Sequence, residues 1–220
     1  MLEIACFNTS SAIAAAKAGA DRVELCANYA AGGVTPPLAS LLSICSATTI
    51  PINIMIRPRA GDFVYTQEEF AQMQADIERF KLSASGFVFG ILDPNNRVDK
   101  VRNKELVELA APLPCTFHRA IDEVQDLDEA VNTVIGCGFT SILTSGGMKN
   151  AVEGADRVAF LQAKLGSQIT FILGGGVRST NAEQLKRNTG VKWVHSAAII
   201  KAGEEMDERE ARKLQEVLQR

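Results

Sequence analysis

Long apolar runs are missing from this sequence, because Asp, Lys, Arg or Asn interrupts every hydrophobic stretch before the roughly 20 residues that a membrane-spanning helix needs. An excess of positive charge is missing too. The chain has 23 Lys and Arg against 26 Asp and Glu, for a net charge of −3, and the basic residues are scattered. Since nucleic-acid binding relies on clustered positive charge, we expect neither a membrane nor a nucleic acid as a partner.

Cysteine and histidine are scarce. The five cysteines have long, irregular spacings and form no C-x-x-C pair, which argues against a disulfide framework and against a structural zinc site. No P-loop, H-E-x-x-H motif or Ser-His-Asp order is present, so no nucleotide cofactor is expected. An acid at Glu3, with no basic segment leading into an apolar one, predicts a cytoplasmic location.

The composition that remains, 46% apolar and 22% charged over 220 residues, is typical of a globular chain with a sizeable core. Short apolar segments alternate with amphipathic ones along its whole length. Several of them are nearly continuous apolar runs, as expected for parallel strands covered on both faces. The predicted strands are Leu2 to Cys6, Arg22 to Cys26, Ile52 to Ile56, Phe87 to Leu92, Cys115 to His118, Thr140 to Leu143, Ile169 to Leu173 and Lys192 to His195.

Helix boundaries are also marked. Capping-box spacing, or an Asp-led version of it, predicts four helix starts, at Thr66, Asp126, Thr180 and Asp207. Glycines fall where a helix should end and the next strand begin, which predicts a left-handed backbone at Gly19, Gly138, Gly166 and Gly190.

Eight strand-then-helix units without a linker predict an α/β chain that forms a single (β/α)8 TIM barrel, one domain over residues 1–220. The alternative is an open doubly wound sheet. That fold usually carries a glycine fingerprint in its first βα turn, and the turn from Cys6 to Ser10 has no glycine.

Polar residues gather just after the predicted strands, where a barrel of this kind builds its ligand site. Both histidines, His118 and His195, lie at such strand ends. Loops are polar in general, which is the simpler explanation, but the turns that enter the strands are plain Gly, Ala and Pro connectors.

These segments together resemble the CutC family of copper homeostasis proteins. The resembling motifs, in order, are Arg22-Val23-Glu24-Leu25-Cys26, Gly32-Gly33-Val34-Thr35-Pro36, Ile56-Arg57-Pro58-Arg59, Thr116-Phe117-His118-Arg119-Ala120, Leu143-Thr144-Ser145-Gly146, Gly174-Gly175-Gly176-Val177 and His195-Ser196-Ala197. The resemblance implies a TIM barrel, a role in copper homeostasis, and self-association as a homodimer or higher oligomer. It points to Cys6 and Cys26 as ligands of the copper ion.

Thiolates and thioethers are the ligands that Cu(I) prefers, and two thiolates on neighbouring strands could hold one such ion. Strand parity opposes this pairing. Side chains alternate along a strand, so if Glu3 and Glu24 point inward, Cys26 shares their face while Cys6 lies with Leu2 and Ile4. Two separately buried thiols are then the alternative.

A different hypothesis is an enzyme that acts on a small anionic metabolite. Gly174, Gly175 and Gly176, followed after the last strand by His195 and Ser196, occupy the position where TIM barrels commonly bind phosphate. Three guanidinium groups and a hydroxyl would come to the same mouth, from Arg57, Arg59, Arg119 and Ser145. A tight glycine turn and a structural ion-pair network are the simpler explanations.

The candidate for general acid or base in such an enzyme is His118, beside Arg119, with the Asp122 carboxylate to fix its tautomer. Glu24 is a second proton carrier if burial raises its pKa. A satisfied core histidine is the alternative for His118. This combination suits a cofactor-independent lyase, isomerase or hydrolase, by analogy with other enzymes of the fold.

Overall fold

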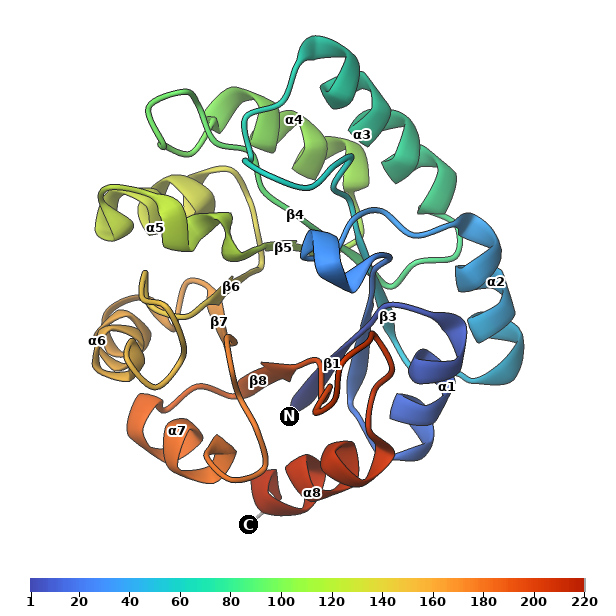
Figure 1. Ribbon diagram of the computed structural model, residues 1–220. Coiled ribbons are helices and arrows are strands. Elements are labelled where there is room, and N and C mark those ends of the chain that lie inside the picture. Colours follow the sequence, from blue (N-terminus) through green and yellow to red (C-terminus); the bar gives the residue numbers. More distant parts are fainter. Residues whose placement is uncertain (220) are drawn as a thin grey trace.

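The computed structural model describes residues 1–219, and their eight strands close into one parallel barrel in sequence order (Figure 1). The TIM barrel prediction is therefore confirmed. The strands are β1 (Leu2–Cys6), β2 (Arg22–Leu25), β3 (Ile52–Met55), β4 (Gly86–Phe89), β5 (Cys115–Phe117), β6 (Ser141–Thr144), β7 (Thr170–Leu173) and β8 (Trp193–Ser196). The ends of each strand differ from the predicted ends by at most three residues.

A ring of helices covers the outside of the barrel (Figure 1). They are α1 (Thr9–Lys17), α2 (Leu38–Ala47), α3 (Gln67–Phe80), α4 (Lys100–Ala110), α5 (Leu127–Gly136), α6 (Ala155–Leu165), α7 (Ala182–Thr189) and α8 (Glu208–Leu218), with short 3-10 turns η1 (Tyr29–Ala31) and η2 (Arg119–Glu123). No helix within residues 1–219 is long and apolar enough to cross a membrane.

Three of the four predicted helix starts are correct. Thr66 forms a full capping box with Glu69, and Asp126 and Asp207 each accept a hydrogen bond from the backbone of the third helical residue. The prediction at Thr180 is wrong, because α7 begins at Ala182 and its N-cap is Asn181, one residue after Thr180. The Asn181 side chain turns back to accept from the Arg178 backbone N–H, so it closes the preceding turn.

Three of the four predicted left-handed glycines have positive φ. Gly166 is the exception, since its φ of −63° continues the right-handed turn that ends α6.

Strand register decides which side chains enter the barrel. The closing pair, β1 and β8, sets Glu3 opposite His195, and β1 with β2 sets Ala5 opposite Glu24. The alternate residues of β1 pack outward with the helices in the main apolar core, as Leu2, Ile4 and Cys6 do. The barrel interior is therefore polar between β8, β1 and β2.

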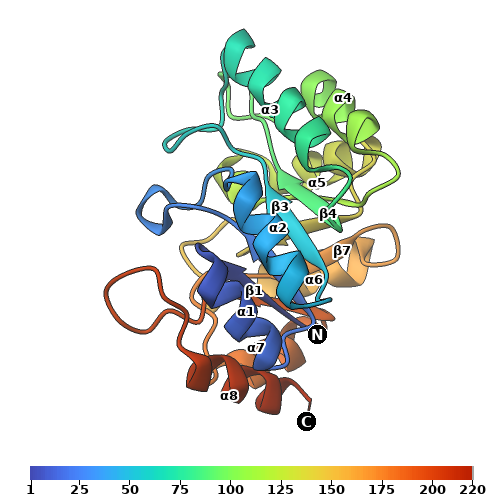
Figure 2. The same ribbon diagram turned by 90° about the vertical axis from the view of Figure 1, so that its right-hand side faces the viewer.

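Loops that leave the carboxyl ends of the strands project from one end of the barrel. Figure 2 shows η1, the loop after β3 and the long loop before α8 on the same side. In TIM barrels this is the end at which ligands bind.

Candidate functional site

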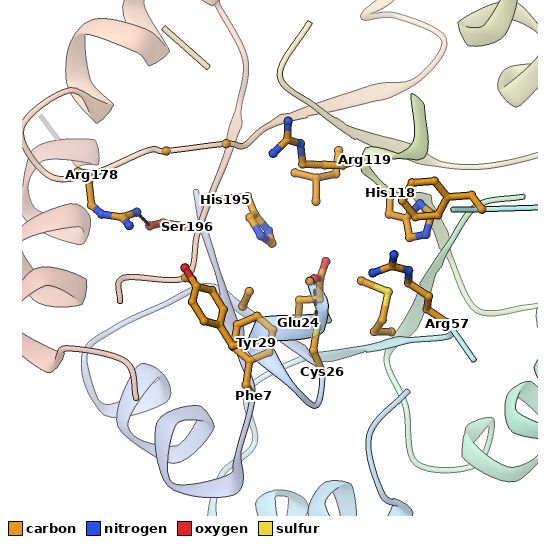
Figure 3. Close-up of a pocket in the computed structure, with 18 residues that line it drawn as sticks. Phe7, Glu24, Cys26, Tyr29, Arg57, His118, Arg119, Arg178, His195 and Ser196 are labelled. Carbon is orange, nitrogen blue, oxygen red and sulfur yellow. Dashed lines mark hydrogen bonds between the residues drawn. The ribbon is translucent and has the colours of Figure 1, made fainter. Parts of the chain in front are cut away.

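A cavity of about 270 Å³ opens at the carboxyl ends of the strands (Figure 3). Side chains from seven of the eight strands or the loops that follow them line it, and Phe7, Tyr29 and Phe63 supply an aromatic part of the wall. The volume is at the small end for ligand pockets, which favours an ion or a small metabolite.

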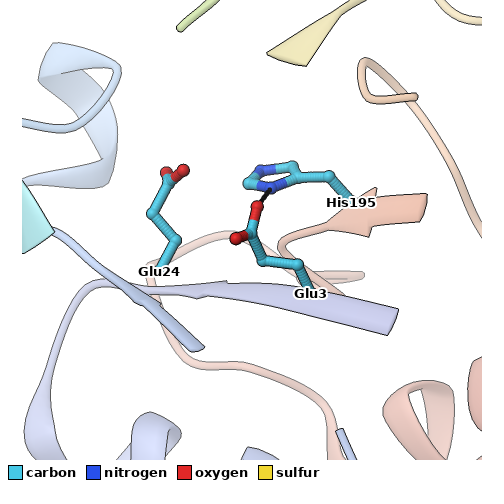
Figure 4. Close-up of side chains that lie close together, drawn as sticks. All are labelled: Glu3, Glu24 and His195. Carbon is cyan, nitrogen blue, oxygen red and sulfur yellow. Dashed lines mark hydrogen bonds and ion pairs between the residues drawn. The ribbon is translucent and has the colours of Figure 1, made fainter. Parts of the chain in front are cut away.

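Three ionisable side chains meet at the bottom of this end of the barrel: Glu3, Glu24 and His195 (Figure 4). Glu3 is fully buried; its carboxylate accepts from Arg22 Nε at 2.6 Å and lies 2.8 Å from His195 Nδ1. Burial alone would raise the pKa of Glu3. The hydrogen bonds and charges of His195 and Arg22 have the larger combined effect, so the pKa of Glu3 is lower than its ordinary value. Glu3 therefore acts as an ionised anchor for His195.

The surroundings of His195 favour its charged form. Burial lowers the pKa of the imidazole, yet the Glu24 and Glu3 carboxylates reverse this and raise the pKa above its ordinary value. Burial raises the pKa of Glu24.

The possible metal-ligand atoms of Glu3, Glu24 and His195 lie within 4.8 Å of one another. Carboxylate oxygens and an imidazole nitrogen are harder ligands than the sulfur ligands that Cu(I) prefers, and the Glu3 carboxylate already pairs with Arg22 and His195.

The two cysteines predicted to share a copper ion lie in different layers. Cys26 lines the cavity and forms a small cluster with Met55 and Val88. Cys6 belongs to the main core between strands and helices, where its thiol lies 3.7 Å from the Ile4 carbonyl. The strand-parity alternative is thus correct, and Cys6 is not a cavity residue.

The Cys26 thiol donates to Glu24 Oε1 at 3.4 Å. Burial and this carboxylate raise the pKa of Cys26 well above its ordinary value. Cys26 is therefore a neutral thiol, and it must lose its proton before its sulfur can bind a metal ion as a thiolate.

His118 is in the cavity wall but lacks the predicted Asp122 partner. Its Nδ1 accepts from the Ala120 backbone N–H at 3.4 Å, and its Nδ1–Cε1 edge packs so closely on Gly90 that a Cβ there would lie 2.8 Å from Nδ1. Burial and the Arg57 charge lower the pKa of His118 to about 3. It is a neutral imidazole, so general-base catalysis that relies on titration near pH 7 does not suit it.

The Asp122 carboxylate instead binds groups of η2 and of the loop that follows β6. Because η2 turns it toward the end of β6, its carboxylate accepts from Arg119 Nε, from Thr144 Oγ1 and from the backbone N–H of Ser145 and Gly147. Neither Asp122 nor Ser145 lines the cavity. The predicted catalytic role of Asp122 as the partner of His118 is wrong.

The predicted guanidinium cluster is only partly formed. Arg57 and Arg119 line the cavity, whereas Arg59 points outside it and pairs with Glu69 at 2.6 Å and Asp62 at 2.9 Å. For Arg59 the structural ion-pair network is the correct alternative.

Gly175 and Gly176 line the rim with positive φ, while Gly174 lies behind them against Leu143 and His195. A Cβ on Gly175 would lie 3.3 Å from Arg119 Nη1. On the far side of this rim, Arg178 holds Ser196 Oγ at 3.4 Å and the Ile199 carbonyl at 3.0 Å. Arg119 and Arg178 both line the cavity beside the glycine loop.

Of the residues predicted to form the site, the structure brings nine to the cavity: Glu24, Cys26, Arg57, His118, Arg119, Gly175, Gly176, His195 and Ser196. Cys6, Arg59, Asp122, Ser145 and Gly174 do not line it. Sequence reasoning missed Arg178 and Met55. Arg178 could have been predicted, because it follows the glycine loop by two residues. Met55 could not, because it stands among the apolar residues of a predicted strand and nothing in the sequence distinguishes it from them.

Comparison with known proteins gives consistent matches. The CutC family model matches residues 1–200. A CutC family protein of Mesorhizobium japonicum is 38% identical over 90% of this chain and 78% of its own, and the human copper homeostasis protein cutC homolog is 37% identical over 90% and 73%. The crystal structure of CutC from Streptococcus agalactiae superposes with a TM-score of 0.84 at 32% identity, covering 90% of this chain and 98% of that one.

A wider likeness concerns the fold alone. Thiamine phosphate pyrophosphorylase from Pyrococcus furiosus superposes with a TM-score of 0.64 at 13% identity, over 99% of this chain and 95% of that one.

Proposed function

The chain belongs to the CutC family, and from that premise we propose that it acts in copper homeostasis by holding one Cu(I) ion as cargo at the barrel mouth, with the Cys26 thiolate as its principal ligand. The name of the human relative, a copper homeostasis protein homolog, supports the role. The alternative, an enzyme that acts on a small anionic metabolite, stays a prediction.

The observation that carries the proposal is the pairing of Cys26 with Met55 at the cavity. Both residues line it and both belong to one small cluster packed by Phe7. A thiolate and a thioether are the soft ligands that Cu(I) prefers. This ligand pair takes the place of the Cys6 and Cys26 pair expected from the sequence.

Binding requires the Cys26 proton to leave. The S–H bond breaks as the Cu–S bond forms, and the proton passes to Glu24 Oε1, which already accepts the thiol hydrogen bond at 3.4 Å, and from there to the solvent. Copper remains Cu(I) throughout. Because a thiol must lose a proton to bind the ion, affinity should rise with pH.

The test is a Cu(I) titration of the reduced protein under anaerobic conditions against a coloured Cu(I) chelator. Wild type should take up one ion per chain, Cys26→Ser should lose it, and Met55→Leu should weaken it. Cys45→Ser is the matched control, because Cys45 is exposed and does not line the cavity. Uptake by Cys26→Ser equal to that of wild type would remove the proposed site.

A further inference from the structure

The cavity wall contains a buried guanidinium, that of Arg57, which forms no ion pair with a carboxylate of residues 1–219. Arg57 is 6% exposed, and among the described residues its guanidinium donates only to the backbone carbonyls of Ala31, Gly33 and Gly61. Within residues 1–219, no carboxylate oxygen lies within 4.0 Å of it. An uncompensated buried cation is costly, and a bound anion in the cavity would stabilise it.

A second donor stands beside it without an acceptor. Because His118 Nδ1 accepts the Ala120 N–H, the neutral ring carries its hydrogen on Nε2. That Nε2 is buried and has no hydrogen-bond partner among the described residues. Phe63 packs on both groups, with its ring centroid 4.8 Å from the Arg57 guanidinium carbon and 4.8 Å from the His118 ring centroid, so the two donors share one part of the wall.

An unpaired acceptor faces them from β2. Glu24 is 3% exposed; its Oε1 accepts from Cys26, whereas its Oε2 is buried without a partner in residues 1–219. Figure 3 shows the Glu24 carboxyl group directed into the space between His195 and Arg57. A hydroxyl group complements Oε2 in either protonation state, because it can donate and accept.

We propose that this cavity binds a small organic hydroxy acid. The ligand carboxylate lies beside the Arg57 charge and accepts from His118 Nε2–H, and its hydroxyl group bonds Glu24 Oε2. A cavity of about 270 Å³ limits the ligand to a few carbon atoms. Hydroxy-acid binding and Cu(I) binding use different atoms of the cavity, since the acid contacts neither the Cys26 sulfur nor Met55.

The experiment uses copper-free protein and pairs of acids that differ by one hydroxyl group: glycolate with acetate, lactate with propionate, and malate with succinate. Melting temperature and calorimetric titration report binding. We expect at least one hydroxy acid to raise the melting temperature and to bind about tenfold more tightly than its partner. No shift with any hydroxy acid, or equal shifts within every pair, would overturn the proposal.

Variants locate the site. His118→Phe removes the donor and keeps the ring, so hydroxy-acid affinity should fall about tenfold. Glu24→Leu should abolish the preference for the hydroxyl group. The control Arg97→Ala, on an exposed loop away from the cavity lining, should bind like wild type.

Failure of this proposal is distinguishable from failure of the copper proposal. Cys26→Ser should lose Cu(I) yet keep hydroxy-acid binding, because Ser also donates to Glu24. His118→Phe should show the reverse. Unchanged hydroxy-acid affinity in a folded His118→Phe protein would refute the assignment, and the wild-type hydroxyl preference tests it independently of any variant.

Discussion

Replacing Glu3 by Gln tests how the barrel holds His195. Glu3 is fully buried between two cationic partners, Arg22 at 2.6 Å and His195 at 2.8 Å. Glutamine keeps the volume but removes the charge that both partners face. Breaking a buried pair by removing one partner typically costs about 3–5 kcal/mol, and we expect the lower end, about 3 kcal/mol, because the amide oxygen still accepts one hydrogen bond.

For a chain of this length, that loss corresponds to a melting temperature lower by about 6–12 °C. Urea unfolding gives the free energy directly. The matched control is Glu208→Gln, whose pair with Arg212 lies on the surface of α8 with both side chains about half exposed. Exposed pairs contribute about 0–1 kcal/mol, so this variant should stay close to wild type.

The Glu3→Gln effect should also depend on pH. The pKa of His195 is raised in the folded chain, so its stabilisation is complete below the unfolded pKa and is lost as pH rises through the folded pKa. The pKa of Glu3 is lowered, so its stabilisation persists above its unfolded pKa and is lost only as pH falls through the folded value. The cost of Glu3→Gln should therefore be larger at about pH 5.5, where His195 is charged, than in mildly alkaline solution. A cost under about 1 kcal/mol, or one independent of pH, would refute the ion-pair reasoning.

Three further predictions follow from other parts of the site. Asp122→Ala should lower the free energy of unfolding by about 3 kcal/mol, because it leaves buried donors without an acceptor, but should not change Cu(I) stoichiometry; urea unfolding and copper titration check this. Gly175→Ala should destabilise by about 1–3 kcal/mol, since its φ is +98° and a Cβ would lie 3.2 Å from Ser145 Cβ, whereas Gly136→Ala, with nothing within 4 Å, should stabilise by about 0.4–1 kcal/mol; equal melting temperatures would contradict this. Because burial and Glu24 raise the pKa of Cys26, Cu(I) affinity should rise with pH up to that pKa by as much as about tenfold per pH unit, and an affinity independent of pH in a chelator competition would contradict thiolate binding.

Much of the architecture follows from local patterns in the chain. The eight apolar runs mark the strands because parallel strands covered on both faces need continuous apolar residues, as in β3 and β7. Strand alternation also separates Cys6 from Cys26 correctly, since the period of two applies to any strand that stays regular to its end. Local rules suffice where the backbone is regular.

The errors lie where the backbone leaves a strand. The spacing of His118 and Asp122 suggests a pair, but η2 intervenes and turns Asp122 toward β6. Arg59 follows Arg57 by two residues in a loop, where side-chain direction has no fixed period, and Glu69 of α3 draws it outward. The Glu3 to His195 pair depends on the closure of β8 on β1, a contact between opposite ends of the chain that no local spacing reveals.

The cavity combines soft and hard groups, with Cys26 and Met55 on one part of its wall and Glu24, Arg57 and His118 around them. A soft ion and an organic anion would therefore meet different atoms of the same opening.

The most direct measurement is a crystal structure of the reduced protein soaked with Cu(I), with anomalous diffraction recorded at the copper edge. We predict one anomalous peak inside the barrel mouth, bonded to Cys26 Sγ and near Met55 Sδ. A peak at Cys6 in the outer core, or copper on the exposed Cys45 alone, would contradict the account.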